Sequence, residues 1–411
     1  MNKKITIAHI MHDSIPFLSG YSIRGKYIVE NQKTNGLDPF VITSPAQSKS
    51  DFREEINEIE YFRFPSDKIN LIDKGILLRI PFFWRYFFRK KFKNHCISVL
   101  RHKNCDIIHA HEVFNVSQVA WKVSQIFQKK LIYELRGVVE DSDVANRRLR
   151  RNSFKYRFDK WEKISVMKKA DAIVVISENL RKYLIERGIK KEKIFVVSNG
   201  VDTNKFYPVP KDKELIKKYN LNGCLVLGYI GSIRKLEGLD LIINAFAKIL
   251  KINFDIKLII VGSGPEKKNL IELATKNDMI RNIIFVDKVN HNDILRYYSV
   301  IDIFVLPRIR ERVNELVTPL KPLEAMAVEK CLLVSDVGGL KELVRDNKTG
   351  MFFHAEDVND FVRKLAILVK NSEKRIDLGS NARNWVCKSR KWDKIVKSYQ
   401  DIYQFTVGNK G

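Results

Sequence analysis

The chain has 411 residues, more than one compact core usually holds, so its length favours two domains of about 200 residues. A hydrophobic content of 45% and an aromatic content of 10% are those of a globular protein and exclude a disordered one. The formal charge of +26, from 74 Lys and Arg against 48 Asp and Glu, suggests an anionic partner such as nucleic acid, acidic lipid or a phosphorylated substrate.

Short apolar runs alternate with longer amphipathic runs along the whole chain, and we predict the short runs to be strands. They lie at residues 4–11, 38–44, 106–111, 130–137, 171–177 and 193–199, and then at 225–232, 256–264, 282–289, 302–307 and 331–339. Continuous runs rich in β-branched residues are typical of parallel strands buried on both faces. Helical patterns between them, such as those at 239–252 and 265–277, predict an α/β protein with two doubly wound domains.

Turn residues and prolines between residues 198 and 223 separate the two halves. We therefore predict an N-terminal domain over 1–203 and a C-terminal domain over 204–390. Apolar residues at helical spacing near the end predict a closing helix over 391–411 that packs back on the first domain.

The five cysteines are scattered and lack metal-ligand spacing, so we expect reduced thiols. The first fourteen residues become polar after a short apolar run, and no stretch of about 18 uncharged apolar residues occurs. We expect neither a secretory peptide nor a transmembrane helix, and hence a cytoplasmic protein that can touch a membrane.

Three loops of the second half are rich in glycine and follow predicted strands, at 231–238, 262–265 and 336–339. Ligands of open parallel sheets bind beyond the carboxyl ends of the strands, where glycine lets backbone amides approach a phosphate. One such loop is typical of any turn, but three in one domain favour a nucleotide ligand.

The stretch VTPLKPLEAMA (317–327) predicts a helix that is entered through Pro322, because proline suits a first helical turn. Glu324 then lies in that first turn. Taken alone, its carboxylate need do no more than complement the helix dipole.

Longer stretches resemble one family. LKPLEAMAVEKCLLVSDVGGLKELVRDNKTGMFF resembles the second-domain signature of retaining, family-4-type nucleotide-sugar glycosyltransferases (glycosyl transferases group 1). GYIGSIRKLEGLDLIINAFAKI resembles their donor-phosphate loop, NGVDTNKF their interdomain junction, and DIIHAH and DAIVVISENLRKYLIERG their first-domain segments. SIPFLSGYSIRGKYIVENQKTNGLDPFVITS resembles the acceptor-side opening of a subgroup that builds bacterial surface polysaccharides. The resemblance implies the GT-B fold, in which two Rossmann-like domains face each other across a cleft.

By this resemblance, Glu324 binds the ribose hydroxyls of the donor, a role that suits a carboxylate with two acceptor oxygens. The family's first Glu would fall at Leu316, with Glu315 one residue off, so we assign its sugar contact to the backbone of 317–320. Main-chain groups around Val289 read the base, which leaves UDP versus GDP open. The predicted donor-binding residues are Gly20, Gly231, Ser232, Lys235, Val289, Thr318, Pro319, Leu320 and Glu324.

The family places an Arg and a Lys in the donor-phosphate loop, where this chain has Ser232 and Glu237. A departing diphosphate needs cations, so other residues must supply them. Lys321, between two prolines, is the best-placed substitute, although it is also compatible with a plain surface lysine. The predicted catalytic residues are His111, which matches a family histidine near the donor sugar, Lys321 and Arg234. We expect His109 to face the core.

On the acceptor side, the resemblance and the strand ends of the first domain point to five residues. They are Asp13, Tyr21, Arg24, Glu134 and Arg136. The carboxylates of Asp13, Glu134 and Glu140 are each suited to take the acceptor proton; equally, Glu134 and Arg136 are suited to form a structural ion pair.

Residues 81–93, PFFWRYFFRKKFK, mix aromatic and basic side chains without an acid, and residues 147–160 add a second basic patch. This composition is typical of a segment in lipid headgroups, of a core helix with a solvated basic face, and of a single-strand nucleic-acid binder. We prefer an anionic membrane surface and do not expect nucleic acid, because no nucleic-acid-binding motif accompanies the patches.

We therefore expect a hexosyltransferase-type enzyme at the inner face of the cell membrane. It would transfer a sugar from a UDP- or GDP-sugar to a glycan or lipid-linked sugar acceptor, with retention, in bacterial polysaccharide or glycoconjugate biosynthesis. We expect no cofactor and no metal. The alternatives are another GT-B enzyme, such as a sugar-nucleotide epimerase, and a non-catalytic basic binding protein.

Overall fold

The computed structural model describes residues 4–17, 19–49, 51–65, 81–112, 115–146, 148–252, 255–290 and 292–408. The chain divides into two compact units. The first comprises Met1–Glu140, Leu149–Ser198 and Trp392–Gly411, and the second comprises Asp141–Arg148 and Asn199–Lys391. The sequence placed the boundary after residue 203 and assigned the closing helix to the first domain.

The first unit is built on an eight-stranded sheet with the order β10-β9-β8-β7-β1-β2-β5-β4. All neighbouring strands of this sheet are parallel except β4 and β5, which pair antiparallel at one edge. The strands are β1 (Thr6–Met11), β2 (Asp38–Thr43), β4 (Arg53–Ile56), β5 (Ile59–Phe62), β7 (Ile107–Glu112), β8 (Lys130–Leu135), β9 (Ala172–Val175) and β10 (Ile194–Val196). A separate pair is formed by β3 (Ser48–Lys49) and β6 (Phe64–Pro65).

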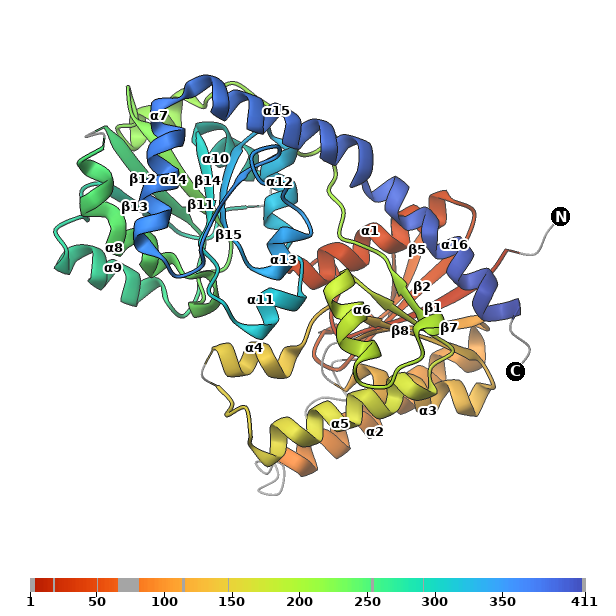
Figure 1. The fold of residues 1–411 in the computed structure, drawn as a ribbon. Coiled ribbons are helices and arrows are strands. Elements are labelled where there is room, and N and C mark those ends of the chain that lie inside the picture. Colours follow the sequence, from red (N-terminus) through yellow and green to blue (C-terminus); the bar gives the residue numbers. More distant parts are fainter. Residues whose placement is uncertain are drawn as a thin grey trace. The chain divides into compact units, whose positions relative to one another are not determined.

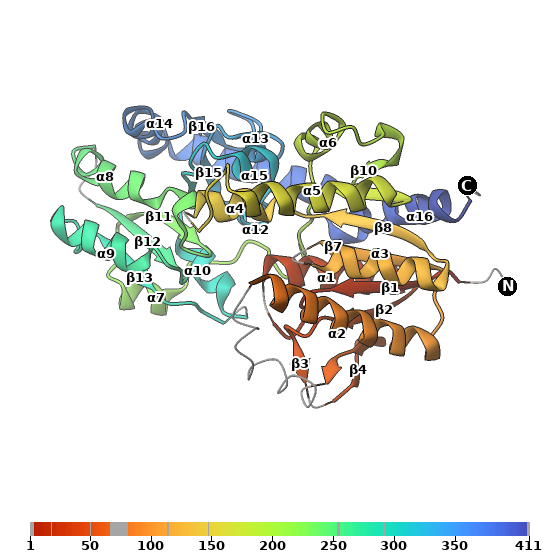
Figure 2. The same cartoon turned by 90° about the horizontal axis from the view of Figure 1, so that it is seen from below.

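Helices cover both faces of this sheet, with α1 and α16 on one side and α2, α3 and α5 on the other (Figure 1). The helices of this unit are α1 (Gly20–Thr34), α2 (Pro81–His102), α3 (Val116–Phe127), α5 (Phe154–Lys169), α6 (Glu178–Ile185) and α16 (Trp392–Gly408), with a short 3-10 helix η3 (Lys191–Lys193). The helix α4 (Val139–Ala145) begins in the first unit, and its residues from Asp141 onward belong to the second. Figure 2 shows α2, α3 and α5 beside one another along the sheet. The closing helix is thus part of the first unit.

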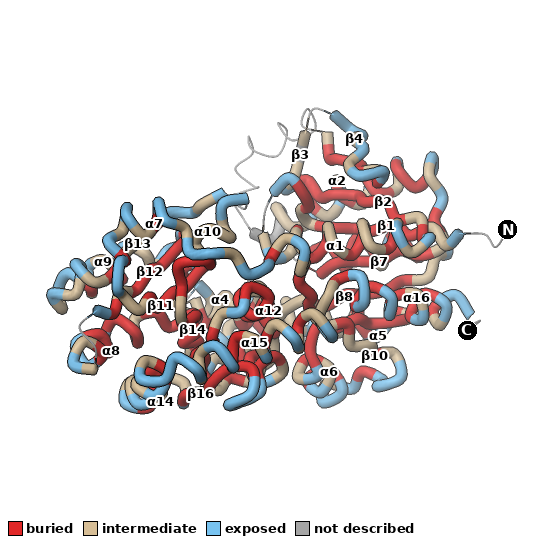
Figure 3. The backbone as a smooth tube through the Cα atoms, turned by 90° about the horizontal axis from the view of Figure 1, so that it is seen from above, coloured by how far each residue is buried: buried red, intermediate tan, exposed pale blue. Residues whose placement is uncertain are grey.

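The second unit has a six-stranded, all-parallel sheet with the order β13-β12-β11-β14-β15-β16. Numbered from its first strand, this is the order 3-2-1-4-5-6 of a doubly wound nucleotide-binding fold. The strands are β11 (Leu225–Ile230), β12 (Ile256–Val261), β13 (Ile283–Val286), β14 (Ile303–Leu306), β15 (Cys331–Ser335) and β16 (Met351–Phe353). They are buried along most of their length (Figure 3).

The helices of the second unit follow the apolar periodicity of the sequence. They are α7 (Lys213–Lys218), α8 (Leu239–Leu250), α9 (Lys267–Lys276), α10 (Ile294–Val300), α11 (Arg312–Leu316), α12 (Lys321–Ala327), α13 (Gly338–Lys341), α14 (Val358–Lys370) and α15 (Ser372–Ser389), with the 3-10 helix η4 (Lys235–Glu237). In α8, for example, Leu239, Ile242, Phe246 and Ile249 recur every three or four residues and are buried.

All eleven predicted strands are confirmed. The sequence did not predict β3, β4, β5, β6 and β16. These strands have two to four residues, and β4, REEI, carries charges and alternates between exposed and half-buried positions at a sheet edge. Such strands lack the continuous apolar run on which the prediction depended.

Candidate functional site

The helix α12 of the second unit begins as the sequence predicted, with Pro322 in its first turn. It follows β14, so its first residues lie at the carboxyl edge of the sheet, where ligands of this topology bind. Lys321 and Glu324 are three residues apart on this helix and therefore share one face.

Lys321 reaches across to the glycine loop after β11. A Cβ atom placed on Gly231 would lie 2.2 Å from Cε of Lys321, and Gly231 has a φ of +148°. Any side chain here would collide with the lysine and strain the backbone. Glycine at this position thus serves two purposes, because it opens the loop and makes room for Lys321.

The ammonium group of Lys321 is held by Glu237, which the sequence analysis noted only as a departure from the family pattern. Its Nζ lies 2.7 Å from Oε1 of Glu237 and donates to the Tyr229 hydroxyl at 2.6 Å. Nη2 of Arg308 lies 3.1 Å from the same Oε1. One buried carboxylate therefore serves two cations, and the cluster of these three side chains has a net charge of +1.

Burial and charge set the titration of this cluster. Burial alone would raise the pKa of Glu237, but the charges of Arg308 and Lys321 hold it at about 2. Burial lowers the pKa of Lys321 to about 8, against the opposing charge of Glu237. Lys321 is therefore largely charged at neutral pH, and a second anion beside it would stabilise that charge.

Glu324 lies half-buried one turn further along α12. The hydroxyl of the buried Tyr298 donates to its Oε2 at 3.1 Å. Burial raises the pKa of Glu324 to about 7. Near neutral pH its carboxyl group is thus close to the midpoint between the charged form, which only accepts hydrogen bonds, and the neutral form, which also donates one.

The remaining predicted donor residues of the second unit have more ordinary surroundings. Ser232 and Arg234 are exposed, and the charge of Arg234 is close enough to contribute to the lowered pKa of Lys321. Lys235 pairs with Asp240 at 2.7 Å on the surface. Val289 is half-buried and packs against the core.

The turn before α12 is fixed from outside the helix. Thr318 and Pro319 are buried and Leu320 is half-buried. Nδ2 of Asn199 donates to the carbonyl of Thr318 at 2.8 Å. The backbone at 317–320 is thereby held in place, as its predicted sugar-binding role requires.

Glu315, the residue beside the missing family Glu, is engaged elsewhere. Its Oε2 accepts from the Gly338 amide at 2.7 Å, and its Oε1 lies 3.0 Å from Nη1 of Arg310. A Cβ on Gly339 would lie 2.2 Å from the Val317 carbonyl oxygen, so this glycine loop packs tightly against the turn before α12. The glycine loop at 336–339 thus presents an amide that already binds a carboxylate.

In the first unit, the predicted residues Tyr21, Arg24, His111, Glu134 and Arg136 come together in one buried network. Glu134 is fully buried, and its Oε1 accepts from Nε of Arg24 at 2.9 Å and from Nε of Arg136 at 2.7 Å. Although burial opposes ionisation, the charges of Arg136 and Arg24 hold the pKa of Glu134 well below its usual range. The ion-pair alternative for Glu134 and Arg136 is therefore what the structure contains.

Tyr21 and Arg24 also donate hydrogen bonds to backbone carbonyl groups of the first unit. The Tyr21 hydroxyl donates to the His111 carbonyl at 2.8 Å. Arg24 donates to the carbonyls of Val197 and Ser198 at 2.8 and 2.9 Å. Asp13 is half-buried beyond β1, and burial raises its pKa. Gly20, the remaining predicted donor residue, is exposed and is the first residue of α1.

Both ring nitrogens of His111 have partners inside the protein. Nδ1 contacts Nη2 of Arg136, and Nε2 lies 2.7 Å from Nδ1 of His9. Because an arginine only donates, His111 accepts at Nδ1 and donates from Nε2 to His9. Burial lowers the pKa of His111 well below its usual value, with the charge of Arg136 as the next cause. His111 is thus a neutral, buried histidine in this network.

The chain of hydrogen bonds continues through the core and closes on itself. His9 Nε2 lies 2.8 Å from Gln32 Oε1, and Gln32 Nε2 donates to the Tyr403 hydroxyl at 2.6 Å. Tyr403 lies 2.9 Å from Nδ1 of His109, and Nε2 of His109 lies 3.1 Å from Oε2 of Glu134. One set of donor and acceptor roles satisfies the hydrogen bonds from Arg136 through His111, His9, Gln32 and Tyr403 to Nδ1 of His109.

The same circuit bears on metal binding. The nitrogens of His9, His109 and His111 lie within 4.8 Å of one another, a spacing at which three imidazoles can share a cation. All three side chains are fully buried, and internal hydrogen bonds use the nitrogens of His9 and His111 and Nδ1 of His109, while Nε2 of His109 lies beside the Glu134 carboxylate. The donor set therefore fits a hydrogen-bond network better than a metal centre. The expected core position of His109 is confirmed.

Glu140, a predicted candidate for the acceptor base, belongs to a polar cluster whose other members, Lys163 and Glu112, the sequence did not predict. Lys163 on α5 pairs with Glu140 at 2.8 Å and lies 3.8 Å from the buried Glu112 at the end of β7. Glu112 follows His111 directly, so the apolar-then-polar end of the β7 segment was the signal that could have found it. The cluster lies at the carboxyl edge of the sheet and offers two further carboxylates there.

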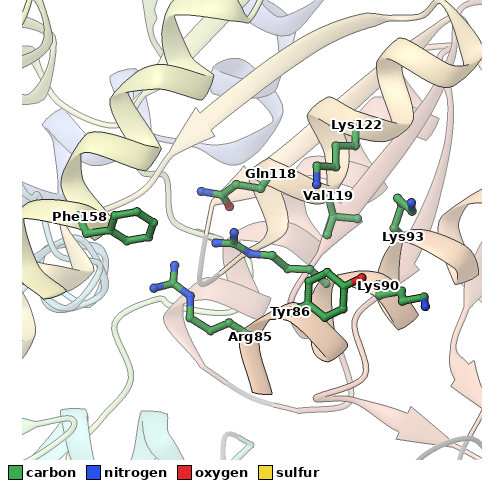
Figure 4. Close-up of a pocket in the computed structure, with 9 residues that line it drawn as sticks. Arg85, Tyr86, Lys90, Lys93, Gln118, Val119, Lys122 and Phe158 are labelled. Carbon is green, nitrogen blue, oxygen red and sulfur yellow. The ribbon is translucent and has the colours of Figure 1, made fainter. Parts of the chain in front are cut away.

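A basic pocket of about 330 Å³ lies among α2, α3 and α5 of the first unit (Figure 4). It is lined by Arg85, Tyr86, Arg89, Lys90, Lys93, Gln118, Val119, Lys122 and Phe158. These residues come from α2, α3 and α5. The side chains of residues 81–83, within the predicted interfacial segment, and Arg147 of the second basic patch lie outside what the structure describes.

The segment 81–93 has both buried and exposed aromatic residues. Phe88 and Phe92 are buried in the core, as expected for a core helix, whereas Tyr86 and Phe87 are exposed. Among the described residues, no helix combines the length and apolar character needed to span a membrane.

Comparison with known proteins agrees with this architecture. Residues 211–385 match the family "Glycosyl transferases group 1", and residues 23–205 match "Glycosyltransferase Family 4". The chain is 27% identical over 258 residues to an uncharacterized glycosyltransferase of Methanocaldococcus jannaschii, and 29% identical over 262 residues to the capsular polysaccharide biosynthesis glycosyltransferase CapM of Staphylococcus aureus. These alignments cover 62% and 60% of this chain and 64% and 66% of the relatives, just under two thirds of their length.

A longer alignment exists with a GDP-mannose-dependent alpha-mannosyltransferase of Corynebacterium glutamicum, 24% identical over 97% of this chain and 90% of that protein. Among solved structures, sucrose-phosphate synthase from Thermosynechococcus elongatus has a TM-score of 0.78 at 20% identity, over 98% of both chains. Anabaena HepE, in a structure with UDP and glucose, has a TM-score of 0.74 at 16% identity, over 97% of this chain and 99% of its own. With its two units and both family matches, the chain belongs to the group 1 glycosyl transferases of the family-4 type and has the GT-B fold.

Proposed function

We propose that this protein transfers a sugar from a UDP- or GDP-sugar to a glycan or lipid-linked sugar acceptor, with retention of anomeric configuration. The observation that carries the proposal is the entrance of α12, where Lys321 packs against Gly231 and Glu324 lies one turn later. A cation beside a glycine loop suits a diphosphate, and a neighbouring carboxylate suits ribose hydroxyls.

The chemistry that we propose uses Lys321 as the cation for the leaving group. The bond between the anomeric carbon and the phosphate oxygen breaks, and the electron pair remains on that oxygen. The acceptor hydroxyl attacks the same face of the sugar, and its proton passes to the departing phosphate. Glu237 holds Lys321 in position before the donor arrives, so little reorganisation is needed at the moment of bond cleavage.

This scheme assigns the stabilisation of the diphosphate to side chains, with no metal ion required. Arg234, exposed near Lys321, is the second cation that we propose for the diphosphate. Arg308 is bound to Glu237 and supports the cluster from within. Chelation with EDTA is therefore expected to leave turnover unchanged.

The relatives support the class of donor without choosing the base. One curated relative is a GDP-mannose-dependent enzyme, and one structural neighbour was solved with UDP and glucose. Similarity to CapM supports a role in bacterial polysaccharide or glycoconjugate biosynthesis. We propose a cytoplasmic location at the inner face of the membrane, with an anionic lipid surface rather than nucleic acid as partner.

The test is a thermal-shift panel of UDP- and GDP-sugars on the wild-type protein, on Lys321→Met and on the control Lys268→Gln. Lys268 is an exposed lysine of the same unit, 88% exposed. We expect one sugar nucleotide to stabilise the wild type and the control, and to stabilise Lys321→Met far less. An equal thermal shift in all three proteins would contradict a role of Lys321 in donor binding.

The active donor is then incubated with lipid-linked and oligosaccharide acceptors, and the anomeric configuration of the product is read by NMR. An α-linked product from an α-linked donor is expected. Hydrogen exchange at C2 of the donor sugar without an acceptor would instead identify an epimerase and overturn the transfer.

A further inference from the structure

The basic pocket of the first unit joins two segments that are far apart in the sequence. Arg85 on α2 pairs with Asp159 on α5 and with Glu162 at 2.8 Å. Arg89, one turn later, also pairs with Glu162, and its Nε donates to Oδ1 of Asn115 at 2.8 Å. These bonds fix α2 against α5 and give the pocket a rigid wall.

The pocket has more positive charge than the two carboxylates of this wall neutralise. Five cations line it, and Asp159 and Glu162 pair with two of them, Arg85 and Arg89. Within the described ranges, Lys90, Lys93 and Lys122 have no carboxylate within ion-pairing distance. All three line the pocket, and Figure 4 shows that Lys122 extends from α3 toward Gln118, whereas Lys90 extends from α2 away from it. Three unneutralised lysines at one opening are suited to a multiply charged anion such as a phosphate group.

The rim beside the pocket is aromatic and exposed. Tyr86 on α2 is 57% exposed, and on α5 Phe154 and Trp161 are 84% and 65% exposed. Phe158 joins this group, because its ring centroid lies 6.0 Å from that of Phe154 and 5.9 Å from that of Trp161. A soluble phosphate ligand would account for the lysines but leave these apolar rings in water. A lipid surface accounts for both, because aromatic rings lie at the headgroup boundary and lysines bind the phosphates.

We propose that this pocket binds the phosphate headgroup of an anionic lipid, with the aromatic rim of α2 and α5 inserted beside it at the membrane surface. The site specifies the membrane location put forward under the proposed function and does not depend on sugar transfer. It would hold the first unit, with its acceptor-side residues, against the membrane.

The experiment measures binding of the full chain to vesicles of phosphatidylglycerol and phosphatidylcholine by co-sedimentation, against vesicles of phosphatidylcholine alone. The test variant is Lys90→Gln with Lys93→Gln and Lys122→Gln. The matched control removes the same charge from the same unit, through Lys182→Gln, Lys190→Gln and Lys191→Gln, which are exposed lysines outside the pocket. A second test variant, Phe154→Ser with Trp161→Ser, removes the rim without changing charge.

We expect the pocket variant to lose on the order of 100-fold in partition to anionic vesicles, because each lysine near such a surface contributes about fivefold. The control should lose much less, and the rim variant should bind weakly while it keeps its charge. Equal losses of vesicle binding in the pocket and control variants would contradict a specific lipid site in the pocket, because net charge alone would then explain the binding.

Two further arms identify the source of the phosphate. One contrary outcome is that free inorganic diphosphate stabilises the protein through the three lysines while vesicles do not bind. That outcome would assign the pocket to a soluble ligand and contradict the lipid site. Retention of single-stranded RNA that depends on the same lysines, without vesicle binding, would do the same. The thermal shift with the active sugar nucleotide is measured on every variant. A normal shift shows an intact donor site, so that failure here is distinct from failure of the proposed function.

Discussion

Each unit contains a buried carboxylate shared by two cations, and the two clusters differ in how their cations are held. In the first unit, Arg24 and Arg136 bind Glu134 and also donate to main-chain carbonyls. In the second unit, the partners found for Lys321 are Glu237 and the Tyr229 hydroxyl, and its side chain is 18% exposed. The cations of the first cluster are bound to the backbone, whereas Lys321 of the second cluster is partly exposed and makes no such contact among the described residues.

This difference teaches that burial of charge has two uses in one chain. Where the cations also hold the backbone, a buried ion pair fixes the fold. Where one cation is held by a carboxylate and a hydroxyl at the carboxyl edge of the sheet, we propose that the pair keeps a charge in position for a substrate. The following predictions separate the two uses.

The largest effect on stability is expected for Glu134→Gln. Removing this charge leaves Arg24 and Arg136 buried without their partner, a loss of about 3–5 kcal/mol in the free energy of unfolding. Glu237→Gln should cost less, because Lys321 can reach solvent. Urea unfolding measures both variants; equal losses would mean that the two clusters have the same role.

Lys321→Met should show the opposite profile. We expect turnover to fall by about 10²–10³-fold, since a preorganised group that stabilises the leaving charge is lost. The free energy of unfolding should change little, because Lys321 is only partly buried. A variant that is active but unstable would place Lys321 with the structural cluster instead.

Glu324→Ala should weaken binding of the sugar nucleotide by about 10- to 100-fold, as expected for loss of hydrogen bonds to a charged group. The fold should survive, because the side chain is half-buried at an edge. Calorimetry with the active UDP- or GDP-sugar measures the change. Unchanged affinity would contradict the ribose-binding role.

The pH dependence of donor binding should show two limbs. Below about pH 7 Glu324 gains a proton and loses the charge that strengthens its hydrogen bonds to the ribose hydroxyls, and above about pH 8 Lys321 loses its charge. Affinity should therefore be highest between these values. Lys321→Met should abolish the alkaline limb alone and Glu324→Gln the acid limb alone, as read from calorimetry with a sugar nucleotide.

The smallest effect is expected for Asp240→Asn, which breaks the surface pair with Lys235. Both side chains are about one third exposed, so the free energy of unfolding should change by less than about 1 kcal/mol. This variant gives the background against which the two buried clusters are compared.

The sequence was sufficient for features that depend on local pattern. Continuous β-branched runs identified all eleven main strands, and Pro322 identified the start of α12. The closing helix followed from its apolar spacing, although the sequence did not show that Tyr399 donates to Glu134 at 2.6 Å.

Features that depend on contacts between distant segments could not be predicted in the same way. Glu237 and Lys321 are 84 positions apart in the numbering, so only the fold reveals that the carboxylate replacing a family lysine holds another lysine. His111 was predicted from its resemblance to a family residue, but its burial and its bonds to His9 and Arg136 arise from three separate strands and their ends. The basic pocket likewise needed three separate segments, because residues of α2 line it together with Lys122 of α3 and Phe158 of α5.

The return of α16 to the first unit has a consequence for the order of events during synthesis. The ribosome makes residues 199–391 between the body of the first unit and the helix that completes it. Until Tyr399 and Tyr403 emerge, Glu134 and His109 lack their hydroxyl partners. The N-terminal unit is therefore translated first but completed last. The second unit can fold completely while the first still lacks α16.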